Sequence, residues 1–143
     1  MSRIEPQPVL PSDDELRAIL GSSKVIAVVG LSSKPWRPSH EVASYLQAKG
    51  YRIIPVNPNE TEVLGERAYP SLADVPEHVD CVDVFRRSEH TPAVAREAVR
   101  VGAAVLWLQE GVIDAEAYRI ATDGGLAVVM GACMMRQRER LEG

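Results

Sequence analysis

Five short apolar segments alternate with segments of helical periodicity, and this alternation constrains the fold more than any other feature. The apolar segments are residues 25–29, 51–58, 81–85, 103–108 and 126–130. Helical spacing of apolar residues is found over residues 13–20, 40–49, 90–101, 114–123 and from 134 to about 141. Strands that alternate with amphipathic helices form parallel sheets with right-handed crossovers. The sequence therefore predicts an α/β fold, a doubly wound, mainly parallel five-stranded Rossmann-like sheet with helices on both faces.

The chain of 143 residues has the length of one domain. Residues 1–11 contain three prolines, so we expect a flexible N-terminal arm followed by a single domain over residues 12–143. Ser12 and Glu15 have the spacing of a capping box, and Gly21 is expected to end the helix that they begin. Residues 60–70 are expected to be irregular, with a short helical turn at 71–74.

Charge and cysteine spacing exclude several classes of function. The formal net charge is −4, which disfavours nucleic-acid binding because that binding depends on a basic surface. No apolar run approaches the roughly 18–20 residues that span a bilayer, so no membrane association is expected. Cys81 and Cys133 lie far apart, which predicts no metal site and two thiols in a reducing cytoplasm.

Basic residues gather where the predicted strands end. Ligands of doubly wound sheets bind at the carboxyl ends of the strands. Lys34 and Arg37 follow the first strand, and Arg86 follows the third. Three cations on one rim of an acidic chain indicate an anionic ligand that carries several phosphates.

The familiar nucleotide motifs are absent. Gly30 stands alone where a dinucleotide loop has three glycines, and Asn57-Pro58 stands where that fold needs an acid for the ribose. No phosphate loop ending in Gly-Lys-Ser/Thr and no nucleophile elbow is present. No catalytic pair is apparent either, because we expect the three histidines to be surface residues and Glu110 to be a solvated turn residue.

With these residues placed, the chain resembles the small stand-alone CoA-binding proteins, which share the N-terminal domain of the succinyl-CoA synthetase alpha subunit. The resemblance covers residues 13–141. The motifs that carry it are Gly30-Leu31-Ser32 with Pro35-x-Arg37-Pro38-Ser39, Gly50-Tyr51-x-Ile53-Ile54-Pro55-Val56-Asn57-Pro58, Val82-Asp83-Val84-Phe85-Arg86 and Trp107-Leu108-Gln109-x-Gly111.

The resemblance implies coenzyme A or an acyl-CoA lying across the strand ends. The implied contacts are Gly30, Leu31, Ser32, Ser33, Lys34, Pro35, Arg37, Ser39, Val56, Asn57, Pro58, Phe85 and Arg86. In this hypothesis the N–H groups of residues 31–33 hold the pyrophosphate, and Lys34 or Arg37 meets the 3′-phosphate or the pyrophosphate. Residues 56–58 flank the adenine or ribose, and residues 85–86 line the pantetheine side.

The chain departs from the family pattern near its end, where an Asp or Asn and an Arg usually precede the last cysteine and a Glu-His pair follows it. Here Gly131-Ala132 and Gln137-Arg138 occupy those places, which leaves open whether the tail keeps a family role. The catalytic histidine of the synthetase belongs to a second domain, for which this chain has no room.

The sequence leaves the question of enzymatic activity open and favours a binding protein with no chemistry of its own, serving a partner enzyme or forming a homo-oligomer. The alternatives are an enzyme using NAD(P) or another nucleotide on a divergent Rossmann loop, and a fold kept for an interaction with its pocket empty.

Overall fold

Five parallel strands form the central sheet of the structure, a computed structural model that describes residues 7–142. The strands are β1 (Val25–Val29), β2 (Arg52–Val56), β5 (Cys81–Val84), β6 (Val105–Leu108) and β7 (Ala127–Met130). Their order is β2-β1-β5-β6-β7, and every neighbouring pair is parallel. The chain runs outward from β1 to β2 and then returns to the other side of β1, so the loops that follow β1 and β5 diverge. A crevice at the carboxyl ends of the strands is the consequence of this reversal.

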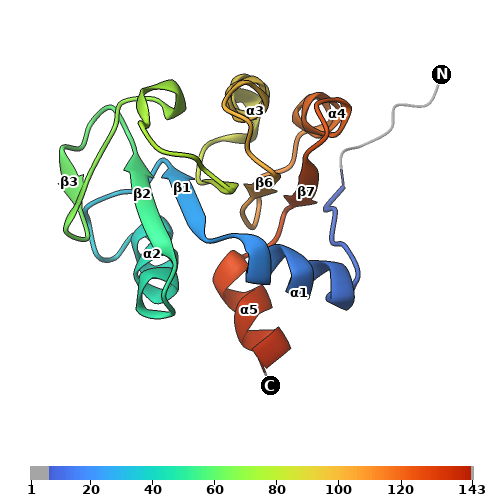
Figure 1. Ribbon diagram of the computed structural model, residues 1–143, viewed down its shortest axis with the longest axis horizontal. Helices are drawn as coiled ribbons and strands as arrows, with labels where there is room; N and C mark the ends of the chain where they lie inside the picture. Colours follow the sequence, from blue (N-terminus) through green and yellow to red (C-terminus); the bar gives the residue numbers. More distant parts are fainter. Residues whose placement is uncertain (1–6, 143) are drawn as a thin grey trace.

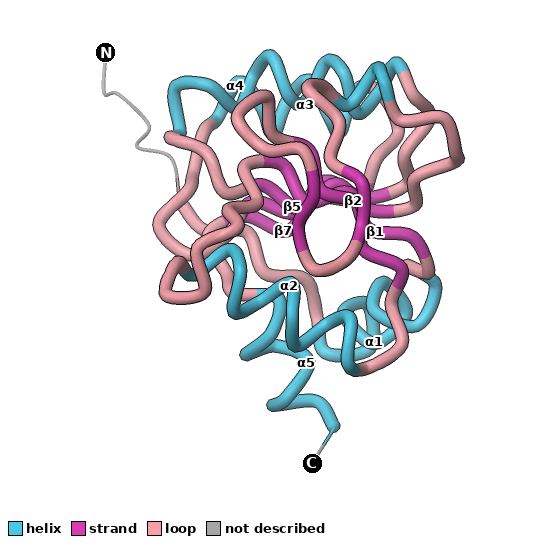
Figure 2. Tube along the Cα trace, turned by 90° about the vertical axis from the view of Figure 1, so that its left-hand side faces the viewer, coloured by secondary structure: helices cyan, strands magenta, loops and turns pink. Residues whose placement is uncertain are grey.

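Helices cover both faces of the sheet, as the sequence predicts (Figure 1). One face carries α1 (Asp13–Ser22), α2 (Pro38–Ala48) and α5 (Met134–Glu142), and the other carries α3 (Thr91–Arg100) and α4 (Ala115–Asp123). Figure 2 shows the strands as the layer between these two sets of helices. No helix within residues 7–142 has the length and apolar character needed to cross a membrane.

Successive side chains of each strand point to opposite faces of the sheet and pack into two separate hydrophobic cores, one on each face. In β1, Ile26 and Val28 pack with α1, α2 and α5, whereas Ala27 and Val29 pack with α3 and α4. Because both faces of such a strand are buried, nearly all of its residues are apolar. The positions of the strands can therefore be predicted from the sequence. The helix boundaries are less exact, because α1 continues through Gly21 to Ser22 instead of ending before the glycine.

The segment expected to be irregular contains a small antiparallel hairpin, and that expectation is wrong. Its strands are β3 (Glu62–Val63) and β4 (Glu66–Arg67). Leu64 and Gly65 join them with φ of 55° and 76°, a pair of left-handed residues typical of a tight hairpin turn. The turn could not be predicted from the sequence, because leucine at the first of these positions is not typical of such turns. The helical turn expected at 71–74 is confirmed by a 3₁₀ segment, Leu72–Asp74.

At each edge of the sheet, one residue from outside the sheet pairs with the edge strand. Val9, within the segment expected to be a flexible arm, exchanges backbone hydrogen bonds of 2.8 and 2.9 Å with Met130 of β7. The first six residues of the expected arm lie outside the described residues. On the opposite side, Tyr69 pairs with β2, the edge strand on which Pro55 lies. Each contact satisfies backbone groups only at the carboxyl end of its edge strand.

Candidate functional site

Gly30 marks the point where β1 meets the exit loop of β5. Its φ is +89°, and its N–H donates to the Val56 carbonyl oxygen at 2.8 Å. A Cβ atom at this position would lie 2.3 Å from the carbonyl oxygen of Phe85. The single glycine of the predicted ligand loop is therefore required by a close approach of two backbones as well as by its left-handed conformation.

The loop between β1 and α2 uses its own N–H groups internally. The Ser32 N–H donates to Oγ of Ser39 at 3.1 Å, and the Lys34 N–H donates to Oγ of Ser32 at 3.1 Å. The Ser33 N–H donates to Oε2 of Glu60 at 2.6 Å. Two of the three N–H groups expected to hold a pyrophosphate are thus already engaged, one of them by the carboxylate of Glu60.

Asn57 ties the end of β2 to the same loop. Its Nδ2 donates to the Leu31 carbonyl oxygen at 3.0 Å, and its Oδ1 accepts from the Asn59 N–H at 2.9 Å. The side chain found where a dinucleotide fold has its ribose-binding acid therefore fixes the relative position of two loops.

A cleft of about 1000 Å³ opens above these loops at the carboxyl ends of the strands. That volume is at the upper end of the range for small-molecule sites. Residues predicted from the sequence that line it are Gly30, Ser32, Ser33, Lys34, Arg37, Ser39, Asn57, Phe85 and Arg86. The structure thus brings together most of the predicted residues, which come from three separate loops.

Four predicted residues do not line this cleft. Leu31 is fully buried, and Pro35 is exposed outside it. Val56 and Pro58 line a second cavity of about 390 Å³, which also touches α3. The two cavities share five residues, namely Gly30, Asn57, Asn59, Phe85 and Arg86.

Sequence reasoning missed twelve further residues of the cleft. They are Pro38, Glu41, Val42, Asn59, Glu60, Arg87, Gln109, Glu110, Val112, Cys133, Met135 and Arg136. A signal existed for those that directly follow a strand, such as Arg87 and Gln109. Glu110 is exposed, as expected of a turn residue, but it also lines the cleft and forms an ion pair of 2.8 Å with Arg136.

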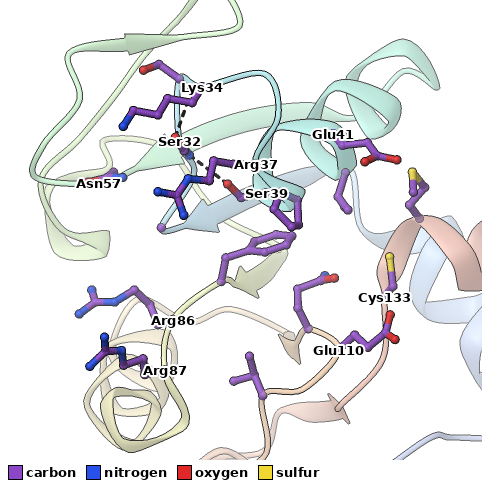
Figure 3. A pocket seen from close by; sticks show the side chains of 18 of the residues that line it. Ser32, Lys34, Arg37, Ser39, Glu41, Asn57, Arg86, Arg87, Glu110 and Cys133 are labelled. Carbon is purple, nitrogen blue, oxygen red and sulfur yellow. Dashed lines mark hydrogen bonds between the residues drawn. The ribbon is translucent and has the colours of Figure 1, made fainter.

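Cations gather at one end of the cleft, which we call the cationic end and define by Lys34, Arg37, Arg86 and Arg87. All four are exposed, and none forms an ion pair within residues 7–142. Figure 3 shows them on the left, with Glu41, Glu110 and Cys133 across the cleft on the right. Exposed cations without partners at the mouth of a cleft attract an anionic ligand.

The loops after β6 and β7 and the first turn of α5 form the opposite end, which we call the uncharged end and define by Gln109, Val112, Cys133 and Met135. The charged residues on this side of the cleft are Glu41 and the ion pair of Glu110 with Arg136. Beneath it lies Asp83, a fully buried carboxyl of the central strand β5. The side-chain amide of Gln109 donates to Oδ1 of Asp83. Burial raises the pKa of Asp83 to about 7, although the hydrogen bond from Gln109 acts in the opposite direction.

Groups suited to metal coordination do not converge here: the described residues contain no cluster of three or more His, Cys, Asp or Glu side chains arranged around an ion. None of the three histidines lines the cleft. Cys81 is buried and Cys133 is half-buried, and both are free thiols.

Comparison with known proteins identifies similar chains. The chain is 47% identical to the uncharacterized protein YneT of Bacillus subtilis (strain 168), over 87% of this chain and 92% of that protein. The solved structure of a hypothetical protein from Pyrococcus horikoshii OT3 has 40% identity and a TM-score of 0.91, with 100% of both chains covered. An ADP-forming acetate–CoA ligase (II) of Archaeoglobus fulgidus is 32% identical over 55% of this chain, a match that spans only 12% of the ligase.

The chain also matches a protein family, and the match includes the sheet and the cleft. The CoA binding domain family matches residues 24–139, a range that runs from the start of β1 into α5 and contains every residue that lines the cleft. This range includes the whole central sheet, and the match extends over most of the chain. The protein therefore belongs to the CoA binding domain family.

Proposed function

We propose that the protein binds coenzyme A or an acyl-CoA across the carboxyl ends of its strands and holds it without catalysing a reaction. The observation that carries the proposal is the division of the cleft into a cationic end and an end whose defining residues, Gln109, Val112, Cys133 and Met135, carry no charge. Coenzyme A has the same division, because its phosphates lie at the nucleotide end and its pantetheine arm is uncharged. Membership of the CoA binding domain family supports the same ligand.

Within this proposal the phosphates are bound mainly by side chains. Lys34 and Arg37 are assigned to the 3′-phosphate or the pyrophosphate, since the neighbouring N–H groups of Ser32 and Ser33 are engaged inside the protein. Arg86 joins them instead of lining the pantetheine side, because it lies with the other cations in Figure 3. The second cavity, with Val56 and Pro58, flanks the adenine or ribose.

Several features favour holding the ligand over transforming it. The histidines lie outside the cleft, Glu60 accepts the Ser33 N–H, and Glu110 is paired with Arg136. We place the protein in the cytoplasm, as a CoA or acyl-CoA carrier or sensor that serves a separate enzyme or works as a homo-oligomer. The ligase relative carries a matching segment within a much longer chain, which supports the idea of a separate enzymatic partner.

Titration calorimetry with coenzyme A, dephospho-CoA, acetyl-CoA and NAD tests the proposal. We expect coenzyme A and acetyl-CoA to bind, dephospho-CoA to bind about tenfold more weakly because it lacks one charge-assisted contact, and NAD not to bind. A preference for NAD, or no binding at millimolar coenzyme A, would reject the proposal. If Lys34 or Arg37 meets the 3′-phosphate, its change to Ala abolishes the preference for coenzyme A over dephospho-CoA.

A further inference from the structure

Gln109 is almost completely buried and yet lines the cleft. It directly follows β6, and its side chain and backbone together are only 3% exposed. Its N–H donates to the Val84 carbonyl oxygen at 3.3 Å, and its own carbonyl oxygen accepts from the Val112 N–H at 2.9 Å. The backbone on both sides of this side chain is therefore fixed, which distinguishes it from the exposed cations at the other end.

The side-chain amide of Gln109 has one preferred orientation. Its Nε2 donates to Oδ1 of Asp83, which is wholly buried, and Oδ2 of Asp83 has no partner among the residues that the structure describes. The unprotonated oxygen of a carboxyl group accepts hydrogen bonds whether or not the other oxygen carries a proton, so Oδ1 selects the nitrogen of the amide. The oxygen, Oε1, accepts no hydrogen bond from any described residue and remains available to a donor in the cleft.

We propose that Gln109, oriented by Asp83, recognises the uncharged arm of the ligand by accepting a hydrogen bond at Oε1 from an amide N–H of that arm. The inference rests on the proposed function and specifies its second half. Gln109 is the contact residue, and Asp83 is a positioning residue that acts through it.

The order of the strands supports this placement. Neighbouring strands lie roughly 4.8 Å apart, so β6 is about 10 Å from β1, with β5 between them. A ligand whose phosphates lie over the loops of β1 and β5 extends its arm toward β6. An amide N–H is a stronger donor than a thiol, and it is present in coenzyme A and in every acyl derivative.

The first test compares two ligands on one variant. Gln109→Met keeps the length of the side chain and removes its acceptor, and 3′-phospho-ADP carries the phosphates of coenzyme A without the arm. We expect the variant to bind coenzyme A about tenfold more weakly and 3′-phospho-ADP within about twofold of the natural protein. Equal losses for both ligands, or no loss for either, would overturn the inference.

A second test alters the ligand and leaves the fold untouched. Replacing an amide of the arm by an ester removes the N–H donor. The arm of coenzyme A contains two amides, so two ester analogues are compared with coenzyme A itself. The natural protein should bind one of them about tenfold more weakly than coenzyme A, and Gln109→Met should bind that analogue and coenzyme A equally. If both proteins discriminate equally, or if desulfo-CoA is the analogue that loses affinity, the amide assignment fails.

The role of Asp83 is tested by two variants, one polar and one apolar. Asp83→Asn keeps an acceptor for Nε2 of Gln109, whereas Asp83→Val removes it. The affinity ratio of coenzyme A to 3′-phospho-ADP should persist in the first variant and fall in the second. A merely structural role would change the affinities of both ligands together, and an unchanged ratio in folded Asp83→Val would contradict positioning.

If the natural protein binds no coenzyme A, both the proposed function and the inference fail. If it binds coenzyme A and Gln109→Met binds it equally well, only the inference is overturned.

Discussion

The two ends of the cleft are built on different physical principles. At the cationic end, exposed side chains without ion-pair partners surround a loop that is tied together by Ser39, Asn57 and Glu60. At the uncharged end, Gln109 is buried and rests on a carboxyl inside the core. Exposed charges attract a ligand over a distance and are screened by salt, whereas a buried polar group discriminates by geometry. The comparison suggests that affinity for the ligand originates at one end and specificity at the other.

The largest effect is expected from a methyl group at the base of the cationic end. Gly30→Ala places a Cβ 2.3 Å from the Phe85 carbonyl oxygen and forces alanine into a left-handed conformation. Overpacking costs about 1–3 kcal/mol and the left-handed conformation about 1–2 kcal/mol, so the free energy of unfolding should fall by up to about 5 kcal/mol. Urea denaturation measures this change.

Gly111 provides a matched control at the uncharged end. It also has a positive φ, 82°, but a Cβ there would meet nothing within 4 Å. Gly111→Ala should therefore cost only the conformational strain, about 1–2 kcal/mol. Equal losses in the two variants would show that the close approach at Gly30 does not matter.

The second effect is a pH dependence that originates beneath the uncharged end. The pKa of Asp83 rises from 3.8 to about 7 on folding because of burial, so the folded state retains a proton that the unfolded state releases. Stability from this group is therefore greatest below about pH 4, falls as pH rises, and levels off above about pH 7. The total loss is at most about 4 kcal/mol at 1.36 kcal/mol for each pKa unit.

Asp83→Asn isolates that contribution, because the asparagine keeps the shape and cannot titrate. The variant should gain stability relative to the natural protein between about pH 4 and pH 7, and the difference should be constant outside that range. Other carboxyls cancel in this difference, including Glu77, whose pKa is lowered by its hydrogen bond from Arg52. A difference that does not vary with pH would mean that Asp83 does not titrate in this range.

The third effect removes two cations from the other end. Lys34→Ala combined with Arg86→Ala should weaken coenzyme A binding about 100-fold, at about tenfold for each charge-assisted contact. Stability should change little, because both side chains are exposed and unpaired within the described residues. Calorimetry at two salt concentrations should also show a weaker salt dependence than that of the natural protein.

Lys24→Ala with Arg119→Ala is the control for net charge, since both residues are exposed and lie outside the cleft. If this control weakens binding as much as the pair in the cleft, the attraction belongs to the whole molecule. The cationic end would then lose its special role in the comparison.

The sequence predicts the two ends unequally, for a physical reason. The cations of the first end lie in the loops that follow β1 and β5, and these strands are recognisable in the sequence as continuous apolar runs. The polar pair of the second end depends on contacts between distant positions, because Asp83 and Gln109 are 26 residues apart and meet through the pairing of β5 with β6. The contact between Ser33 and Glu60, 27 residues apart, is invisible for the same reason. An aspartate within an apolar strand is nevertheless a usable signal, because a buried carboxyl requires a partner.

The smallest effect concerns the tail that departs from the family pattern. Arg138 lies on α5, which begins next to Cys133 at the uncharged end. Its Nε donates to Oη of Tyr51 at 3.2 Å, its guanidinium lies 5.5 Å from the centre of that ring, and it pairs with Glu142. Arg138 thus fastens the last helix to Tyr51, the residue that precedes β2.

Arg138→Ala should lower the free energy of unfolding by about 1 kcal/mol, the net contribution of one such hydrogen bond, and should leave 3′-phospho-ADP binding unchanged. Because α5 supports the uncharged end, coenzyme A should bind about twofold to threefold more weakly, a loss smaller than that of Gln109→Met. Glu139→Ala is the control, since that exposed residue of the same helix forms no ion pair among the residues described. If Arg138→Ala weakens both ligands alike, α5 supports the whole cleft, and the two ends are less independent than their construction indicates.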